Sequence, residues 1–234
     1  MAEDLLETLL ERNRAHVAGL APGYFDPVRE TQRPPVVSMC CSDSRVSQEG
    51  MWNVSEPGWL FTPSTIGNQV WDDYDGEHVV SGNVLYPVAH TETRTIVVVG
   101  HTGCGAITTA LGVARGEIDL TTEPPGVRKW ISMLVPIVEE ALASGVVDRN
   151  AQHSTAVDRL VEYNVDRQVA FLQENEEVPP DEDVFGFVYD FMGTYGDVPG
   201  RAYLINANGE TDPEVLSAHL PDEYRDHVRR LLTH

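Results

Sequence analysis

The sequence predicts an α/β protein with a mainly parallel β-sheet flanked by helices. Apolar, β-branched runs such as Thr95–Val99 are typical of strands that are buried on both faces of a parallel sheet. Segments with apolar side chains at helical spacing lie between these runs, and this alternation favours an α/β fold. No repeat or linker divides the chain. We therefore expect a single domain over residues 1–234, with an N-terminal helical arm over 1–33 and an α/β core with C-terminal helices over 34–234.

The first part of the chain predicts one long helix followed by two short strands. Leucines at helical spacing predict an amphipathic helix over Glu3–Ala18. A proline-rich loop then leads into a buried strand over Val36–Cys40, and Gly58–Thr62 is expected to form a second strand. We also expect a helix over His78–His90, although Pro87 leaves its end open.

Strands and helices continue to alternate in the second part, where Thr95–Val99 should be the central strand. Three helices are expected after it: from Gly105 to about Arg115, from Pro124-Pro125 through Val138 with a kink at Pro136, and over about Asn150–Glu174. Strands over Val184–Phe191 and Ala202–Asn206 and two short terminal helices that begin near Pro213 and Pro221 should follow.

The chain is strongly acidic, with a formal net charge of -21 and Lys129 as its single lysine. Such a surface repels nucleic acid and anionic lipid, so we expect neither nucleic acid nor a membrane as a partner. Two hypotheses fit this composition. The protein is an ordinary one of low isoelectric point, or it has the acidic surface of a halophile, since molar salt shortens the Debye length to about 3 Å.

Cysteine content and the N-terminal sequence bear on location. Cys40, Cys41 and Cys104 are too few to form a disulfide framework. The acidic first residues lack the features of a signal peptide, and no apolar run is long enough to cross a bilayer. A cytoplasmic, reducing location is therefore expected.

Two segments with chemically active side chains follow predicted strands: Cys41–Arg45, which reads Cys-Ser-Asp-Ser-Arg, and His101–Gly105, which reads His-Thr-Gly-Cys-Gly. Ligands of an open parallel sheet bind at the carboxyl ends of its strands. If the two strands are neighbours, the side chains of Cys41, His101 and Cys104 can converge there.

Two thiolates and one imidazole form a ligand set that suits zinc, and three protein ligands leave the fourth tetrahedral position open, as in catalytic sites. Cys104 is also expected at the start of a helix, which favours its thiolate form. Taken singly, each cysteine is more often a buried thiol, and His101 a hydrogen-bonded histidine. The joint pattern favours a metal site. Adjacent strand residues face opposite ways, so only one of Cys40 and Cys41 can be a ligand, and the pattern alone does not choose between them.

At these two segments the sequence resembles the beta class of carbonic anhydrases, which carries a Cys-x-Asp-Ser-Arg motif and, downstream, a His-x-x-Cys-Gly motif. The register of the resemblance selects Cys41 as the ligand and leaves Cys40 in the core. Weaker similarities extend it from about Pro34 to Ala207, and they are Glu56-Pro57-Gly58, Gly67-Asn68, Asn164-Val165, Gly186–Asp190 and Gly196.

The resemblance implies a twisted, mainly parallel sheet with one antiparallel edge strand, and an N-terminal helix that embraces a partner subunit. It implies a homodimer as the minimal unit, with a higher homo-oligomer left open. It also implies a Zn²⁺ cofactor and reversible hydration of carbon dioxide to bicarbonate and a proton, by attack of the hydroxide that zinc makes available near neutral pH.

The resemblance also implies roles for side chains around the metal. Asp43 would accept a hydrogen bond from that hydroxide, and Arg45 would keep Asp43 ionised and oriented. In an alternative state, Asp43 binds zinc itself at lower pH and stops the reaction. Ile66, Gly67 and Gly103 are expected to line the substrate pocket. Tyr86 is expected either to line it across a dimer interface or to be an ordinary aromatic core residue.

The chain departs from the family pattern at one segment. Many members have Arg-Asn-Ala-Gly-Asn where this chain has Ser-Thr-Ile-Gly-Asn at Ser64–Asn68. A subclass uses that arginine, with a tryptophan before the first zinc cysteine, to bind inhibitory bicarbonate. Ser64 and Ser38 stand at those places, so we expect no such regulatory pocket. No histidine is an evident proton shuttle.

Three other functions compete with this one. Carbonyl sulfide or carbon disulfide hydrolysis uses the same zinc ligands, and the sequence does not show the access route that distinguishes it. A non-catalytic zinc-binding domain is disfavoured because it needs neither Asp43 nor Arg45. A redox role for Cys40 and Cys41 is weak, since adjacent cysteines lack the Cys-x-x-Cys geometry.

Overall fold

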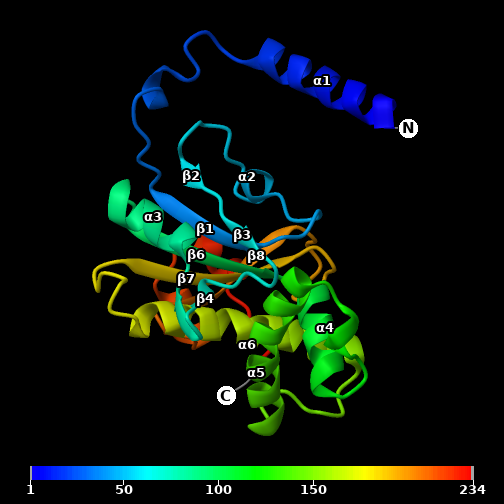
Figure 1. Ribbon diagram of the computed structural model, residues 1–234. Helices are drawn as coiled ribbons and strands as arrows, with labels where there is room; N and C mark the ends of the chain where they lie inside the picture. The colour runs from blue at the N-terminus through cyan, green and yellow to red at the C-terminus, as the bar shows by residue number, and fades with distance from the viewer. Residues whose placement is uncertain (1, 233–234) are drawn as a thin grey trace.

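The computed structural model describes residues 2–232. Met1 of the predicted arm and residues 233–234 of the predicted core lie outside the described residues. A central sheet has the strand order β2-β1-β6-β7-β8, and β3 also pairs with β1 (Figure 1). The strands are β1 (Val36–Cys41), β2 (Leu60–Phe61), β3 (Ser64–Thr65), β6 (Thr95–His101), β7 (Asp183–Asp190) and β8 (Arg201–Ala207).

All pairings in this sheet are parallel except that of β7 with β8, which is antiparallel. The predicted α/β class with a mainly parallel sheet is therefore confirmed. β1 and β6 are neighbours, with Cys40 beside Val99, so the ends of both strands reach the same edge of the sheet. β6 is longer than expected and includes His101, which places this side chain on the sheet itself rather than on the loop after it.

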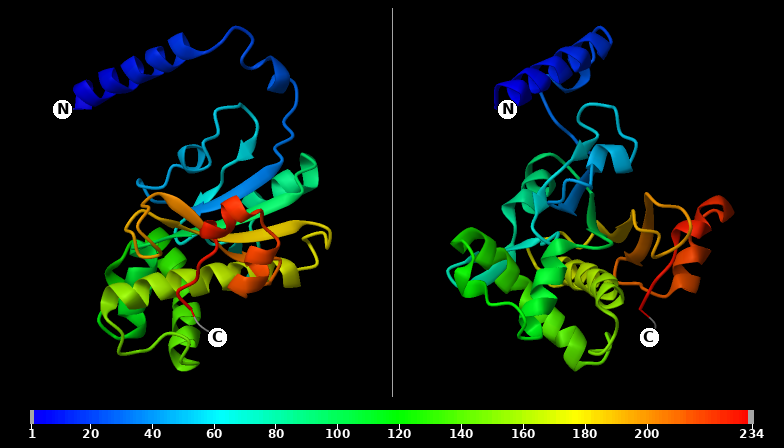
Figure 2. Two further views of the ribbon diagram at one scale, coloured as in Figure 1. Left: turned by 180° about the vertical axis from the view of Figure 1, so that it is seen from behind. Right: turned by 90° about the vertical axis from the view of Figure 1, so that its right-hand side faces the viewer.

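Three helices pack together on one face of the sheet: α4 (Gly105–Ala114), α5 (Pro125–Ala143) and α6 (His153–Glu174) (Figures 1 and 2). Their apolar side chains form one core with the sheet, in which Ile107, Leu134 and Val161 join Met39 and Val98. Pro136 lies inside α5, which continues through it, so the kink stays a prediction.

The opposite face of the sheet carries a smaller cluster around Cys40, Val97 and Val99. Met51 and Trp52, at the end of the short helix α2 (Gln48–Met51), pack against it. Cys40 is fully buried in this cluster, which confirms its placement in the core on the side away from Cys41.

Helix α1 (Ala2–Gly19) projects from the body of the chain on an extended segment (Figure 2). The predicted helix is therefore confirmed, but its apolar side chains remain uncovered: Leu5, Leu6, Leu9, Leu10 and Val17 are each between 58% and 67% exposed. A helix of this amphipathic kind is stabilised in proteins mainly by packing of its apolar face. That face is available for contact with another molecule.

The predicted helix over His78–His90 is wrong in its first residues. β4 (Trp71–Tyr74) and β5 (Glu77–Val80) form an antiparallel hairpin, and α3 (Gly82–His90) begins only after it. Asp75 and Gly76 both have positive φ, as a two-residue hairpin turn of type I′ requires. Ser81 then caps α3 by accepting a hydrogen bond from the backbone N–H of Asn83.

The C-terminal segment contains α7 (Pro213–Ala218) and a 3₁₀ helix over Asp222–His227, near the two expected terminal helices. Further 3₁₀ turns over Asp26–Val28 and Leu120–Thr122 were not predicted. Among the described residues, no helix is both long and apolar enough to span a membrane.

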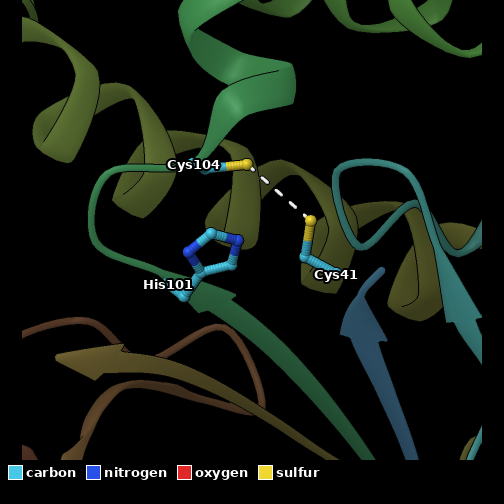
Figure 3. Close-up of side chains that lie close together, drawn as sticks. All are labelled: Cys41, His101 and Cys104. Carbon is cyan, nitrogen blue, oxygen red and sulfur yellow. Dashed lines mark hydrogen bonds between the residues drawn. The ribbon is translucent and has the colours of Figure 1, made fainter. Parts of the chain in front are cut away.

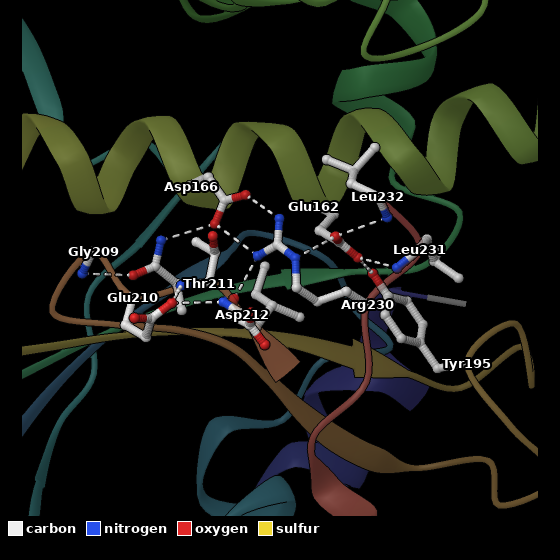
Figure 4. A network of polar contacts seen from close by, with 12 residues as sticks. Glu162, Asp166, Tyr195, Gly209, Glu210, Thr211, Asp212, Arg230, Leu231 and Leu232 are labelled. Atoms are coloured by element: carbon white, nitrogen blue, oxygen red, sulfur yellow. Dashed lines mark hydrogen bonds and ion pairs between the residues drawn. The ribbon is translucent and has the colours of Figure 1, made fainter. Parts of the chain in front are cut away.

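A buried polar network ties the end of the chain to α6 (Figure 4). Glu162 accepts hydrogen bonds from the backbone N–H groups of Leu231 (2.7 Å) and Leu232 (3.0 Å) and from the Tyr195 hydroxyl (2.7 Å). Arg230, whose side chain is 2% exposed, pairs with Glu162 at 3.2 Å and with Asp166 at 2.6 Å. These contacts fix the C-terminal segment across the helix that also backs the candidate site.

Candidate metal centre

Three predicted ligands meet at the carboxyl ends of two neighbouring strands. Cys41 is the last residue of β1, His101 is the last residue of β6, and Cys104 is the N-cap residue of α4. Their side chains point toward one another (Figure 3). One ligand atom from each lies within 4.8 Å of the other two, and all three residues are buried.

The geometry of this cluster fits a tetrahedral metal. Two sulfurs bound at about 2.3 Å to one zinc ion in tetrahedral geometry lie about 3.8 Å apart. The sulfurs of Cys41 and Cys104 are 3.8 Å apart. His101 Nδ1 donates to the carbonyl oxygen of Thr102 at 3.0 Å, because a carbonyl can only accept. His101 Nε2 is buried without a hydrogen-bond partner among the described residues, which suits a metal ligand.

The two thiols of this cluster differ in acidity. The hydrogen bond from Cys41, together with the neighbouring His101 imidazole, holds the pKa of Cys104 well below its usual value. The same contact with Cys104, reinforced by burial, raises the pKa of Cys41. The first thiolate therefore forms at Cys104, and a divalent cation would favour deprotonation of both. The donor set, its spacing and the unpartnered nitrogen all match zinc.

A carboxylate–guanidinium pair lies beside the cluster. Arg45 donates to Asp43 through Nε (2.8 Å to Oδ1), Nη2 (2.6 Å to Oδ2) and its backbone N–H (2.9 Å to Oδ1). The hydrogen bonds from the Arg45 side chain hold the pKa of Asp43 well below its usual range, against the effect of burial. Asp43 Oδ2 is 3.5 Å from His101 Nε2, so an ionised carboxylate oxygen faces the position that a metal would occupy.

Sequence reasoning missed Phe191, which touches both parts of the site. Its ring lies under the Arg45 guanidinium, with Cζ 4.6 Å from the ring centroid, and is stacked on the His101 ring at 5.7 Å. The predicted strand over Val184–Phe191 includes it, but β7 ends one residue earlier and Phe191 begins the following loop. An aromatic residue after a strand carries no sequence signal of such a role.

The structure brings some of the predicted pocket residues to the ligands. The backbone N–H of Gly67 donates to the Cys41 sulfur at 3.4 Å, and the carbonyl of Gly103 accepts from Arg45 at 3.3 Å. Ile66, next to Gly67, is partly buried against the core. Tyr86 is 51% exposed on α3, where its ring packs against Phe61 and His90 rather than against a ligand.

The two serines that replace family residues are both engaged within the chain. Ser38 accepts a hydrogen bond from Trp52 Nε1 at 3.4 Å, and Ser64 accepts one from Gln48 Nε2 at 3.1 Å. Neither contributes a positive charge, and the expectation of no bicarbonate pocket at this place stays a prediction.

Comparisons with known proteins agree with this site. Residues 36–193 match the family model described as carbonic anhydrase. The chain is 32% identical over 149 residues to a carbonic anhydrase of Pseudomonas aeruginosa, an alignment that covers 64% of this chain and 63% of that protein, just under two thirds of its length. It is 29% identical over 201 residues to carbonic anhydrase 2 of Mycobacterium tuberculosis, covering 86% of this chain and 84% of that protein.

Solved structures of beta-carbonic anhydrases are also similar to this chain. A Coccomyxa beta-carbonic anhydrase in complex with acetazolamide is similar with a TM-score of 0.69 and 27% identity, covering 95% of each chain. One of two tetrameric beta-carbonic anhydrases of Sordaria macrospora is similar in fold with a TM-score of 0.69 at 23% identity, covering 87% of this chain and 98% of that chain.

Proposed function

This chain belongs to the beta class of the carbonic anhydrase family, and we propose that it catalyses the reversible hydration of carbon dioxide to bicarbonate and a proton. One observation carries the proposal. Two sulfurs and a buried, unpartnered imidazole nitrogen meet at the strand ends, beside an ionised carboxylate that is already held by an arginine.

Zinc is the metal that this site would hold, through Cys41, His101 and Cys104. When bound there, zinc would lower the pKa of a water molecule to about 7 and so supply a nucleophile at neutral pH. Three protein ligands leave one tetrahedral position for that purpose. The side chains around this position would orient the nucleophile.

Asp43 and Arg45 would orient the nucleophile. Since its pKa is low, Asp43 stays ionised and acts as a hydrogen-bond acceptor rather than as a proton carrier. Two hydrogen bonds from the Arg45 side chain restrict rotation of the carboxylate, and the Phe191 ring supports the guanidinium from below. Acceptance of a hydrogen bond by a fixed oxygen would aim the lone pair of the nucleophile at the substrate carbon.

We also propose pocket residues, an oligomeric state and a cellular location for this protein. Ile66, Gly67 and Gly103 would line the substrate pocket, and Tyr86 would reach it from a partner subunit. A homodimer is supported by the uncovered apolar face of α1 and by the tetrameric assembly reported for the Sordaria proteins. A cytoplasmic location is supported by three cysteines that form no disulfide.

Stopped-flow carbon dioxide hydration, with zinc content measured on the same sample in high KCl, tests the proposal. We expect activity in the zinc-loaded wild type and a large loss in Asp43→Ala at unchanged zinc content. Parallel assays with carbon disulfide should show no turnover. Zinc-loaded protein without carbon dioxide hydration, or with equal rates in both variants, would contradict it.

A further inference from the structure

The segment from His101, the last residue of β6, to Cys104, the N-cap residue of α4, is termed here the ligand loop, and it contributes two of the three ligands. The backbone N–H of Thr102 donates to the Tyr189 carbonyl at 3.1 Å, and its hydroxyl donates to Asp190 at 3.1 Å. Both contacts join the ligand loop to β7, whose last residue is Asp190. One further contact comes from a different element.

Asp158, on α6, accepts a hydrogen bond from the backbone N–H of Gly103 at 2.8 Å. Its other carboxylate oxygen accepts from the Thr194 hydroxyl at 3.0 Å. The residue is only 5% exposed, so the contact is shielded from water. A buried charged acceptor of this kind forms a stronger hydrogen bond than a neutral one.

The peptide that Asp158 binds is the one that holds His101. The N–H of Gly103 and the carbonyl of Thr102 belong to the same planar peptide group. At one edge of this group the N–H donates to Asp158, and at the opposite edge the carbonyl accepts a hydrogen bond from His101 Nδ1 at 3.0 Å. Hydrogen bonds in such a chain polarise one another, so the carboxylate makes the carbonyl a better acceptor for the imidazole.

Only glycine fits at position 103, so the side chain of Asp158 rather than a side chain of residue 103 is available to fix this peptide. The φ of Gly103 is +63°, and a Cβ at this position would lie 2.6 Å from the sulfur of Met192. The carbonyl of Gly103 accepts from Arg45 at 3.3 Å. Gly103 therefore joins two peptide groups: the Thr102–Gly103 peptide contacts the imidazole, and the following Gly103–Cys104 peptide contacts Arg45.

We propose that Asp158 is a positioning residue that acts through the Thr102–Gly103 peptide to hold His101 Nε2 toward the metal. Carboxylates commonly orient metal-bound histidines by accepting the second ring N–H directly. Here one peptide group stands between the carboxylate and the ring. This proposal rests on the proposed zinc site, and it assigns a function in metal binding to a residue of α6 that lies outside both motifs.

The test is the zinc dissociation constant, measured by competition with a chromophoric chelator. Asp158→Leu removes the acceptor, and we expect zinc affinity to fall by about 10- to 100-fold, the range seen when hydrogen-bond partners of metal ligands are lost. Asp158→Asn keeps an acceptor for the Gly103 N–H and should recover most of this affinity. Thr194→Val is the matched control, because it removes the other partner of Asp158 and leaves the Gly103 contact in place.

A second measurement separates metal binding from general stability. Urea unfolding of each metal-free variant gives the part of the effect that belongs to the fold. If Asp158→Leu does not fold, Asp158→Ala replaces it, since alanine also removes the acceptor and adds no large apolar side chain beside the cavity of about 290 Å³ that Asp158 lines with Ser154 and Thr155. Asp158→Ala should bind zinc less tightly than Asp158→Asn.

Three results would overturn the inference. Wild-type affinity in the variants that lack the acceptor would remove the role of Asp158. An equal loss in Thr194→Val would assign the effect to general loosening of the neighbouring loop. Wild-type protein that takes up no zinc would overturn this inference and the proposed function together, whereas the first two results would leave the proposed function standing.

Discussion

Replacement of Arg45 by leucine tests how much the site depends on an oriented Asp43. In the native protein, the side chain of Arg45 forms two hydrogen bonds with the carboxylate, at 2.8 and 2.6 Å. Leucine removes both and also the positive charge. The backbone N–H of residue 45 would still donate to Oδ1, so Asp43 keeps one of its three contacts. The carboxylate should then sample other rotamers.

The magnitude follows from the number and exposure of the lost contacts. Hydrogen bonds to charged groups contribute about 1.5–3 kcal/mol each where they are buried. The Arg45 side chain is 49% exposed, so solvent screens the interaction, and about 1–2 kcal/mol for the pair is a reasonable value. If this free energy orients Asp43 in the transition state, its loss slows the reaction by about tenfold.

The assay is stopped-flow carbon dioxide hydration at mildly alkaline pH, normalised to bound zinc. Arg45→Lys is the control, since it keeps the charge without the two-pronged geometry and should fall between wild type and leucine. Rates for zinc-loaded Arg45→Leu within about twofold of wild type would refute the reasoning, because the difference would be well below the tenfold expected from the contacts.

Other predictions concern stability, salt and ligand choice. Glu162→Gln places an amide against four donors in the buried network, so it should lower the free energy of unfolding by about 3–5 kcal/mol in urea titrations. Asp166→Asn should have a smaller effect. A loss below about 1 kcal/mol for Glu162→Gln would contradict the account of this network. The melting temperature should rise with KCl concentration if the net charge of -21 is a salt adaptation, and a flat response would reject that hypothesis. Cys41→Ala should abolish stoichiometric zinc binding while Cys40→Ala preserves it, and metal analysis showing the reverse would reassign the ligand.

The sequence predicted the parts of the fold that depend on local pattern. The run Thr95–Val99 is apolar and β-branched, and it forms part of the central strand β6 because such residues suit burial on both faces. The N-terminal helix was equally evident. The sequence did not predict the hairpin before α3, because a short run of valines near His78 fits either a helix or a strand. The Asp75-Gly76 turn decides between them.

In the candidate site, too, some residues could be predicted from the sequence and others could not. The three ligands were predictable because their residue types and strand-end context limit what they can bind. Phe191 and Asp158 were not, because an aromatic ring in a loop and a carboxylate on a helix are common features without a spacing signature. Only the packing of α6 and of the loop after β7 against the ligand loop reveals their contacts with His101, Arg45 and Gly103.

The central claim is that Cys41, His101 and Cys104 together bind one zinc ion and leave a coordination position open. X-ray absorption at the zinc edge of the purified protein tests it most directly. We expect a shell of two sulfurs at about 2.3 Å, with the remaining ligands being nitrogen or oxygen near 2.0 Å. A shell with no sulfur, or one of four sulfurs, would contradict it.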